Sequence, residues 1–252
     1  MFTFNDKVVW VTGSSTGIGR AIAINFAENG AKVVVHGNSN KEDAEKTLEA
    51  VKEKGAEAIL VMGDVTDRQQ VSQMTETIKE KFNKIDILVN NAGTMVKRAK
   101  IEEIDAETLQ RIIDVNFSSV VYVTQAVLPL MRTQEKGSII NMTSIAARNG
   151  GGGGAVAYAS AKAAVSTLTR GLAKELAGDN IRVNGIAPGI ITTPFHERYS
   201  TPELRLNMAG QVPMGREGTP DEIAGAALYL ASDFAGYITG EIIEINGGLL
   251  MD

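Results

Sequence analysis

A tyrosine and a lysine four residues apart are the side chains of this sequence best suited to proton transfer. Tyr158 and Lys162 stand in a segment of helical period, so their spacing places both on one helical face, one turn apart. A nearby ammonium lowers the pKa of a phenol from about 10, which lets tyrosine exchange a proton with a substrate oxygen near neutral pH. The pair predicts acid-base chemistry, although by itself this spacing also arises by chance.

Two further polar residues stand where such chemistry needs support. Ser144 directly follows the run 139–143, the carboxyl end of an expected central strand, where parallel α/β enzymes place their chemistry. Asn116 lies in a helical segment although Asn is a poor helix former, which favours a polar role. Simpler roles stay open for both: Ser144 as a cap of a turn or helix, and Asn116 as a solvent-facing side chain.

Glycines at three spaced positions mark the turn after the first expected strand. Residues 12–19 read Thr-Gly-Ser-Ser-Thr-Gly-Ile-Gly and lead into an apolar helical segment. Glycines in such a turn let the backbone approach a pyrophosphate, which then sits against free N–H groups at a helix N-terminus. Because a strand precedes this turn and a helix follows it, dinucleotide binding is favoured over a purely structural turn.

The end of the second expected strand bears on which dinucleotide is bound. Residues 36–40 read His-Gly-Asn-Ser-Asn and contain no acid. A carboxylate at this place grips the ribose hydroxyls of NAD and would repel a 2′-phosphate. The sequence therefore favours NADP(H), with donors from His36, Asn38 and Ser39, and leaves NAD(H) open because no Arg is present either.

A parallel sheet has to position these residues. Short Val- and Ile-rich runs alternate with longer segments of helical period, which predicts parallel strands joined by crossover helices. The runs 8–11 and 33–35 are apolar on both faces, as buried parallel strands are. The expected strands are 7–12, 32–36, 57–62, 85–90, 137–143, 181–186 and 241–245. We expect one α/β domain over residues 1–252, with a ligand crevice beyond the carboxyl ends of the strands.

Composition excludes several classes of protein. The chain has 252 residues with 25 Lys and Arg against 30 Asp and Glu, and this net charge of -5 disfavours a nucleic-acid partner. Zero Cys removes disulfides and thiolate chemistry, and two His leave no cluster with metal-ligand spacing, so we expect no metal. No uninterrupted apolar run approaches the roughly 18 to 20 residues of a membrane helix. We therefore expect no membrane association and an unprocessed cytoplasmic protein.

Taken together, these motifs resemble the short-chain dehydrogenase/reductase family in its single-domain form. The resemblance covers essentially the whole chain and implies a Rossmann-type doubly wound parallel sheet of about seven strands with helices on both faces. It rests on Thr12-Gly13-x-x-x-Gly17-Ile18-Gly19, Asp64-Val65, Asn90-Asn91-Ala92-Gly93, Asn116, Ser144, Tyr158-x-x-x-Lys162, Pro188-Gly189 and Ile245-Asn246-Gly247-Gly248. Two features depart from the family. The interval from Ser144 to Tyr158 is one residue longer, which keeps Thr143 open as an alternative to Ser144, and Asn246 stands where Asp is more usual.

The resemblance implies an NAD(P)(H)-dependent oxidoreductase that interconverts a small carbonyl and the corresponding secondary alcohol by hydride transfer. Tyr158 would then be the general acid in reduction and the base in oxidation, while Ser144 would polarise the substrate oxygen. Lys162 would hold the nicotinamide ribose and lower the pKa of Tyr158, and Asn116 would position a water behind Lys162.

The resemblance also implies a cofactor site along the strand ends. Asp64 and Val65 would contact the adenine, residues 91–93 the adenosine side, and Ile191 with Thr193 the nicotinamide amide. The full set of expected cofactor contacts is Gly13, Ser15, Thr16, Gly17, Ile18, Gly19, His36, Asn38, Ser39, Asp64, Val65, Asn91, Ala92, Gly93, Tyr158, Lys162, Pro188, Gly189, Ile191 and Thr193.

The substrate segment is expected between residues 194 and 215. Its members Phe195, His196, Tyr199, Leu204 and Met208 form a mixed lining that fits many ketones, sugars or acyl groups. The glycine run 150–154 is either a flexible surface loop or a place where backbone passes close to substrate.

The charged residues expected near the active site indicate the class of substrate. We rank a free small carbonyl or alcohol first, because Glu135 and Asp179 stand where an enzyme that docks an acidic carrier needs basic residues. A 3-oxoacyl-carrier-protein reductase is the alternative, and a non-catalytic dinucleotide-binding module is the remote one. The resemblance further implies a homotetramer.

Overall fold

Seven parallel strands pair into one sheet in the order β3-β2-β1-β4-β5-β6-β7. The computed structural model describes residues 2–251. The strands are β1 (Val8–Val11), β2 (Lys32–Gly37), β3 (Ala58–Met62), β4 (Ile87–Asn90), β5 (Gly137–Met142), β6 (Ile181–Pro188) and β7 (Ile242–Ile245). Every strand expected from the sequence is present, and the doubly wound α/β fold is confirmed.

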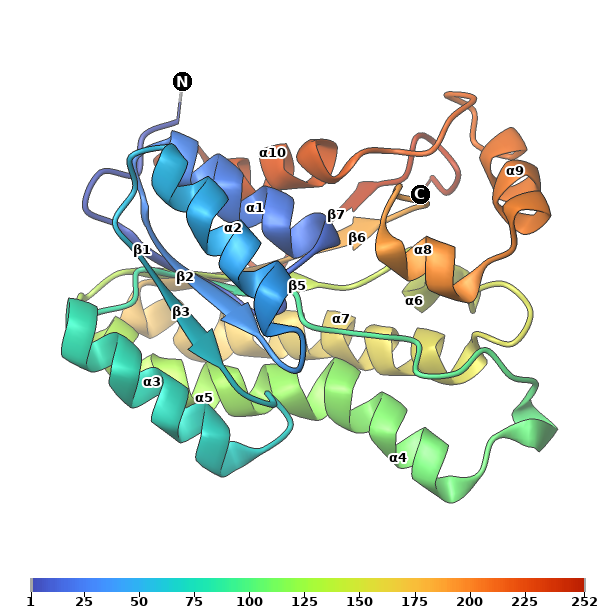
Figure 1. Cartoon of the computed structure of the whole chain (residues 1–252), viewed down its shortest axis with the longest axis horizontal. Helices are drawn as coiled ribbons and strands as arrows, with labels where there is room; N and C mark the ends of the chain where they lie inside the picture. The colour runs from blue at the N-terminus through green and yellow to red at the C-terminus, as the bar shows by residue number, and fades with distance from the viewer. Residues whose placement is uncertain (1, 252) are drawn as a thin grey trace.

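Helices cover both faces of the sheet (Figure 1). The α-helices are α1 (Gly17–Glu28), α2 (Lys41–Glu53), α3 (Arg68–Phe82), α4 (Ala106–Ile113), α5 (Ser119–Arg132), α6 (Ala146–Asn149), α7 (Val156–Leu176), α8 (Pro194–Tyr199), α9 (Pro202–Gly210) and α10 (Pro220–Ala231). Short 3-10 turns lie at η1 (Ile101–Glu103), η3 (Ala177–Asp179) and η4 (Asp233–Ala235), and a π-helix lies at η2 (Asp114–Ser118).

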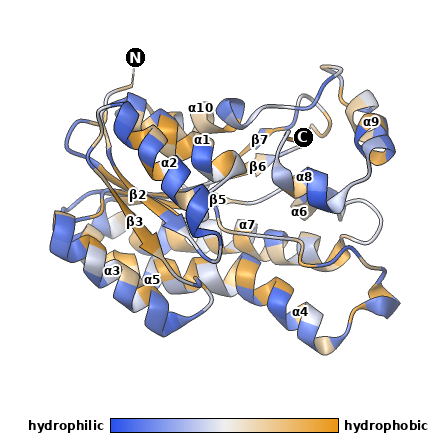
Figure 2. Ribbon diagram, viewed as in Figure 1, coloured by the Kyte–Doolittle hydropathy of each residue, from blue (hydrophilic) through white to orange (hydrophobic). Residues whose placement is uncertain are grey.

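Alternation along the strands explains the two layers of helices. In β1, Val9 and Val11 pack with the layer formed by α1, α2 and α10, whereas Val8 and Trp10 pack with α3, α5 and α7. All four side chains are completely buried, as expected of a central strand with helices on both faces. Figure 2 shows the result: apolar strands at the centre and helices whose polar sides face outward.

The winding of the chain reverses at β1, which pairs with β2 on one side and with β4 on the other. In sheets of this kind the loops that leave β1 and β4 at their carboxyl ends diverge and open a crevice. The turn 12–19 leaves β1 at this place, and the segment 91–100 leaves β4.

The helical run from Ala106 to Arg132 passes through α4, η2 and α5 and is long and apolar enough, by length and composition, to cross a membrane. In this fold α5 packs against β4, β5 and α3. Its apolar side therefore faces the core of the domain. The π-helical turn within this run contains Asn116, and such turns are frequent at functional sites.

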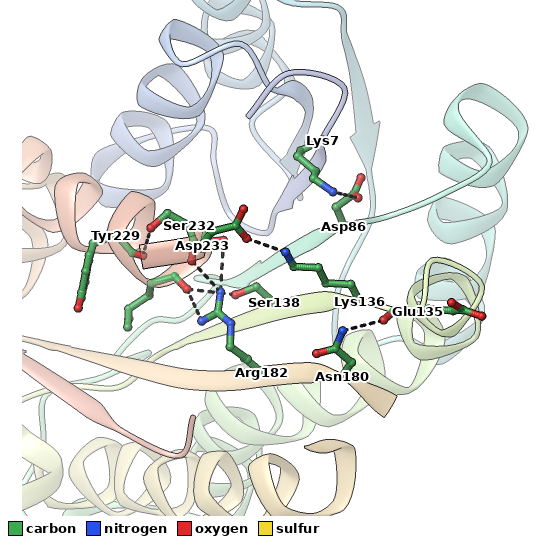
Figure 3. A network of polar contacts seen from close by, with 12 residues as sticks. Lys7, Asp86, Glu135, Lys136, Ser138, Asn180, Arg182, Tyr229, Ser232 and Asp233 are labelled. Carbon is green, nitrogen blue, oxygen red and sulfur yellow. Dashed lines mark hydrogen bonds and ion pairs between the residues drawn. The ribbon is translucent and has the colours of Figure 1, made fainter. Parts of the chain in front are cut away.

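A polar network at the amino-terminal edge of the sheet closes the end of α10 (Figure 3). The guanidinium of Arg182 donates to the carbonyl oxygens of Leu230, Ala231 and Ser232, at distances of 2.7, 3.3 and 3.2 Å. Carbonyls at the end of a helix lack partners within the helix, so Arg182 satisfies them and joins β6 to α10.

Glu135 and Asp179 also lie at this edge, so the expectation that they stand beside the mouth of the active site was wrong. Glu135 stands just before β5 and Asp179 just before β6, and both strands run away from these residues toward the crevice. Asn180 donates to the Glu135 carbonyl oxygen (Figure 3). Asp179 pairs with Arg132 at 2.8 Å. In a parallel sheet, residues that precede a strand lie at the edge opposite the crevice, so these acids give no information about the substrate.

Candidate active site

A cleft of about 1180 Å³ lies at the carboxyl ends of the strands. It is lined by all twenty expected cofactor residues, which come from the carboxyl ends of β2 and β6, from the loops after β1, β2, β3, β4 and β6, and from α1 and α7. Ser144 also lines it, as do all five expected substrate residues of the segment 194–215. This volume of about 1180 Å³ exceeds the roughly 300 to 1,000 Å³ that is usual for a site of one small molecule, so a dinucleotide and a small substrate have room together.

The glycine turn is held by His36, in a way the sequence did not reveal. The Gly13 N–H donates to Nδ1 of His36 at 2.8 Å, and Nε2 of His36 lies 2.9 Å from the Gly63 carbonyl oxygen. His36 is buried, and burial lowers its pKa, which favours this neutral form of the ring. With both ring nitrogens engaged, His36 positions the turn and has no donor left for a nucleotide. Asn38 and Ser39, which follow it, are exposed at the cleft.

The first turn of α1 fits a pyrophosphate. Thr16 precedes the helix without a capping hydrogen bond from its side chain, and no acid occupies the first turn. The N–H groups and the positive end of the helix dipole are therefore available to an anion in the cleft. Asn91 fixes the turn from β4 by donating to the carbonyl oxygens of Thr12 and Gly13 at 2.9 and 3.0 Å. A Cβ at Gly19 would lie 2.5 Å from the Gly13 oxygen, so this position has no room for a side chain.

Asp64 lies at the far side of the cleft, after the edge strand β3. Its carboxylate accepts hydrogen bonds from the N–H and hydroxyl of Thr66 and pairs with Arg111 at 3.1 Å. Burial by itself raises the pKa of Asp64, but the bonds from Thr66 and Arg111 outweigh it and leave the pKa below its ordinary value. The carboxylate is thus ionised and fixed in orientation beside Val65.

Tyr158 and Ser144 meet on the wall of the cleft. Ser144 follows β5, Tyr158 stands in the first turn of α7, and the Ser144 hydroxyl lies near enough to the Tyr158 phenol to lower its pKa. Thr143, the alternative to Ser144, is buried and donates its hydroxyl to the Ile186 carbonyl oxygen at 3.1 Å. Its hydroxyl is therefore engaged within the sheet, and Ser144 is the one that reaches Tyr158.

The pKa of Tyr158 moves in the direction opposite to the one predicted. Burial raises it to about 12, and the nearby Ser144 hydroxyl only partly opposes this rise. Lys162 lies on the same helix face, but its Nζ is 5.9 Å from the centre of the Tyr158 ring and donates to the Met142 carbonyl oxygen at 2.8 Å. Burial lowers the pKa of Lys162 itself to about 8. Without a cofactor, desolvation of both groups thus outweighs the effect of one charge on the other.

Asn116 lies behind this wall, completely buried in the π-helix η2. Its Nδ2 donates to the carbonyl oxygens of Thr94 and Ile112 at 2.7 and 2.9 Å, and its Oδ1 accepts from the Thr94 N–H at 3.1 Å. A Cβ at Gly93 would lie 2.9 Å from Asn116 Oδ1 and 3.1 Å from Lys162 Nζ. Asn116 therefore holds the loop after β4 close to Lys162. It is the one expected site residue that does not line the cleft.

Aromatic side chains form the substrate end of the cleft. The ring of Phe195 lies 5.7 Å from that of Tyr158 and 5.1 Å from that of Tyr199, measured between ring centres. The hydroxyls of Tyr199 and Thr94 are hydrogen-bonded at 2.7 Å, which joins α8 to the loop after β4. Helix α8 thus covers the side of the cleft that contains Tyr158.

Arg98 is a cleft residue that the sequence analysis missed. It lies in the loop after β4 and donates to the carbonyl oxygens of Tyr199 and Gly153 at 2.8 and 2.7 Å. The glycine run reaches the cleft here, since residues 151–153 line it. A cation eight residues after Asn90, at the carboxyl end of a central strand, was a usable signal in the sequence. Among residues 2–251 no group of three or more His, Asp or Glu is arranged to hold a metal ion.

The sequence and the fold both resemble those of known reductases. A sequence model described as "Enoyl-(Acyl carrier protein) reductase" matches residues 13–250. The 3-oxoacyl-[acyl-carrier-protein] reductase FabG of Thermotoga maritima is 40% identical over 245 residues, which are 97% of this chain and 98% of that protein. The 3-oxoacyl-[acyl-carrier-protein] reductase of a Synechocystis species is 39% identical over 257 residues, which are 100% of both chains. The crystal structure of an NADH-dependent reductase A1-R', described as responsible for alginate metabolism, matches 99% of each chain with a TM-score of 0.90 and 34% identity.

Proposed function

Because the chain belongs to the short-chain dehydrogenase/reductase family and is an NAD(P)-dependent oxidoreductase that interconverts a carbonyl and an alcohol, we propose that it reduces a free small carbonyl compound with NADPH. One observation carries this proposal. Tyr158 and the neighbouring Ser144 hydroxyl line the same cleft as the uncapped first turn of α1. Acid chemistry and dinucleotide recognition thus share one site.

The reacting groups have complementary roles. The bound nicotinamide supplies the hydride. The Ser144 and Tyr158 hydroxyls donate to the substrate oxygen, and Tyr158 delivers its proton as negative charge develops there. A pKa of about 12 keeps the Tyr158 phenol protonated at neutral pH, which suits the direction of reduction. The Lys162 ammonium lies behind the Tyr158 ring and stabilises the phenolate that proton transfer leaves.

The preference for NADPH rests on the wall after β2. Asn38 and Ser39 are exposed there and no carboxylate follows β2 before Glu42, so a 2′-phosphate meets neutral donors rather than a repelling charge. Titration of the protein with NADPH and with NADH, followed by cofactor fluorescence, tests this preference. We expect tighter binding of NADPH; tighter binding of NADH would overturn it. Ser39→Asp should weaken NADPH binding selectively, whereas the uncharged control Ser39→Asn should not.

A carrier-bound 3-oxoacyl substrate is the second candidate, and the relatives from Thermotoga and Synechocystis favour it by name. The free carbonyl is placed first because α8 lies over the substrate end, with Phe195 packed on Tyr158. NADPH oxidation measured with ethyl acetoacetate and with an acetoacetyl carrier protein separates the two. Saturation by the carrier at micromolar concentration, with poor turnover of the ester, would reverse the order.

We also propose a homotetramer in the cytoplasm. Large apolar side chains are exposed on several elements, among them Val156 on α7, Phe234 in η4 and Tyr237 after it, and such surfaces suit contacts between subunits. The absence of Cys fits a reducing compartment. Sedimentation equilibrium should give four times the chain mass of 26.8 kDa, and a monomer at micromolar concentration would contradict it. Cell fractionation tests the compartment, since recovery with membranes would oppose it.

A further inference from the structure

Arg98 joins the three segments that surround the substrate end of the cleft. It belongs to the loop after β4, its Nε donates to the last carbonyl of α8 at Tyr199, and its Nη1 donates to Gly153 in the glycine run. The neighbouring Ala99 N–H donates to the Gly154 carbonyl oxygen at 3.0 Å, which holds the glycine run to the same loop. The guanidinium is thereby fixed in orientation by backbone acceptors.

This guanidinium lacks an anionic partner. Both of its hydrogen bonds go to neutral carbonyl oxygens, and Nη2 has no acceptor among residues 2–251. Arg98 is partly buried, and burial lowers its pKa, with no carboxylate acting in the opposite direction. A partly desolvated cation without a counter-ion gains stability when a ligand supplies the negative charge.

The lining of the cleft has a strong asymmetry of charge. Asp64 is its only acid among the described residues, and it lies after β3, across β2, β1 and β4 from Ser144, and is paired with Arg111. The substrate end instead carries Arg98 and Arg198, and His196 there leaves its buried Nδ1 without a hydrogen-bond partner among residues 2–251. An anion is therefore favoured at this end.

We propose that Arg98 binds an anionic group, a carboxylate or a phosphate, carried by the carbonyl substrate. The inference rests on the proposed function and narrows its substrate class. Planar guanidinium groups bind both anions through directed, charge-assisted hydrogen bonds, and here Nη2 is the free donor. Orientation of Arg98 by two backbone carbonyls means that little rotational freedom is lost on binding.

Matched pairs of ketones test this proposal. Acetoacetate and ethyl acetoacetate share one ketone and differ in the carboxylate, and dihydroxyacetone phosphate and dihydroxyacetone differ in the phosphate. We expect the wild type to give a higher kcat/KM for the anionic member of one pair, which identifies the group. In Arg98→Gln the ratio of anionic to neutral kcat/KM for that pair should fall by at least about tenfold, as for loss of a charge-assisted bond.

Two further variants separate anion binding from the structural ties of Arg98. Arg98→Lys keeps the charge and should retain part of the preference for the anion. If the role of Arg98 were purely structural, its replacement would lower kcat/KM equally for the anionic and the neutral ketone of a pair. Lys97 is exposed, does not line the cleft and serves as the matched control, so Lys97→Gln should leave the ratio unchanged. A ratio that stays the same in Arg98→Gln would overturn the proposal.

Calorimetry distinguishes failure of this inference from failure of the proposed function. The protein saturated with NADP⁺ is titrated with acetoacetate and with dihydroxyacetone phosphate, so that binding is measured without turnover. Binding of either anion that is lost in Arg98→Gln supports the anion site even where no ketone is reduced. A different result would refute the anion site alone: the enzyme reduces neutral ketones, but binding of acetoacetate and of dihydroxyacetone phosphate does not depend on Arg98. The proposed reductase function would then still hold.

Discussion

Replacement of Lys162 by Met should inactivate the enzyme and yet stabilise the cofactor-free protein. Lys162 is 3% exposed, and burial lowers its pKa from 10.5 to about 8. At about 1.36 kcal/mol per pKa unit, this shift corresponds to roughly 3 kcal/mol of destabilisation at pH 7. Met has a similar length and no charge, but it loses the bond to the Met142 carbonyl oxygen, worth about 1 kcal/mol. The expected net gain is about 2 kcal/mol.

Thermal unfolding of the cofactor-free protein measures this gain. For a chain of this size, about 2 kcal/mol raises Tm by roughly 4 to 8 °C. The folded-state pKa lies below the unfolded value, so the destabilisation is complete below about pH 8 and fades as the pH rises toward 10.5. The difference in Tm between variant and wild type should therefore narrow over this range.

Lys174→Met is the matched control, because Lys174 is exposed on the same helix. It should change the unfolding free energy by no more than about 0.5 kcal/mol. A Tm for Lys162→Met at or below that of the wild type at pH 7, with the control unchanged, would refute the claim that the buried ammonium is a net cost.

Two other substitutions test the cleft and the opposite edge of the sheet. Gly19→Ala should weaken NADPH binding at least about tenfold and destabilise the protein by about 1–3 kcal/mol, because the added Cβ meets the Gly13 oxygen. The control Gly171→Ala should do neither, because nothing lies within 4 Å of its added Cβ. Fluorescence titration measures NADPH binding and thermal unfolding measures the stability. Arg182→Met should lower the free energy of unfolding in urea by about 2–3 kcal/mol with kcat unchanged, since three carbonyls lose their donor. Arg132→Met breaks an exposed ion pair and should change the free energy of unfolding by less than about 1 kcal/mol. Equal effects of the two Arg variants would contradict the role of Arg182 at the end of α10.

The sheet could be predicted because its strands are buried on both faces. Runs such as 8–11 are apolar at every position, and the structure buries all four side chains. The placement of the expected cofactor residues around one cleft could also be predicted, because the carboxyl ends of parallel strands meet at one edge of the sheet. By the same rule, residues that precede a strand lie at the opposite edge, and this rule would have placed Glu135 and Asp179 correctly.

The hydrogen-bond partners and burial of individual side chains could not be predicted from the local sequence pattern. His36 is engaged by Gly13 and Gly63, which are 23 and 27 residues away in sequence, so no spacing rule indicates that its ring is occupied. The raised pKa of Tyr158 reflects burial, which depends on how neighbouring segments pack around it rather than on the helical spacing to Lys162. Arg98 acquires its place from α8 and the glycine run, both distant in sequence.

Deuterium transfer from the cofactor provides the most direct test of hydride transfer with Tyr158 as the proton donor. NADPH deuterated at the reactive carbon is incubated with ethyl acetoacetate, and the alcohol product is analysed by mass spectrometry for the wild type and for Tyr158→Phe. We expect one deuterium in the wild-type product, a rate at least about a hundredfold lower in Tyr158→Phe, and nearly the same NADPH affinity in both. Transfer by Tyr158→Phe at more than about a tenth of the wild-type rate would contradict the assignment of Tyr158 as the proton donor.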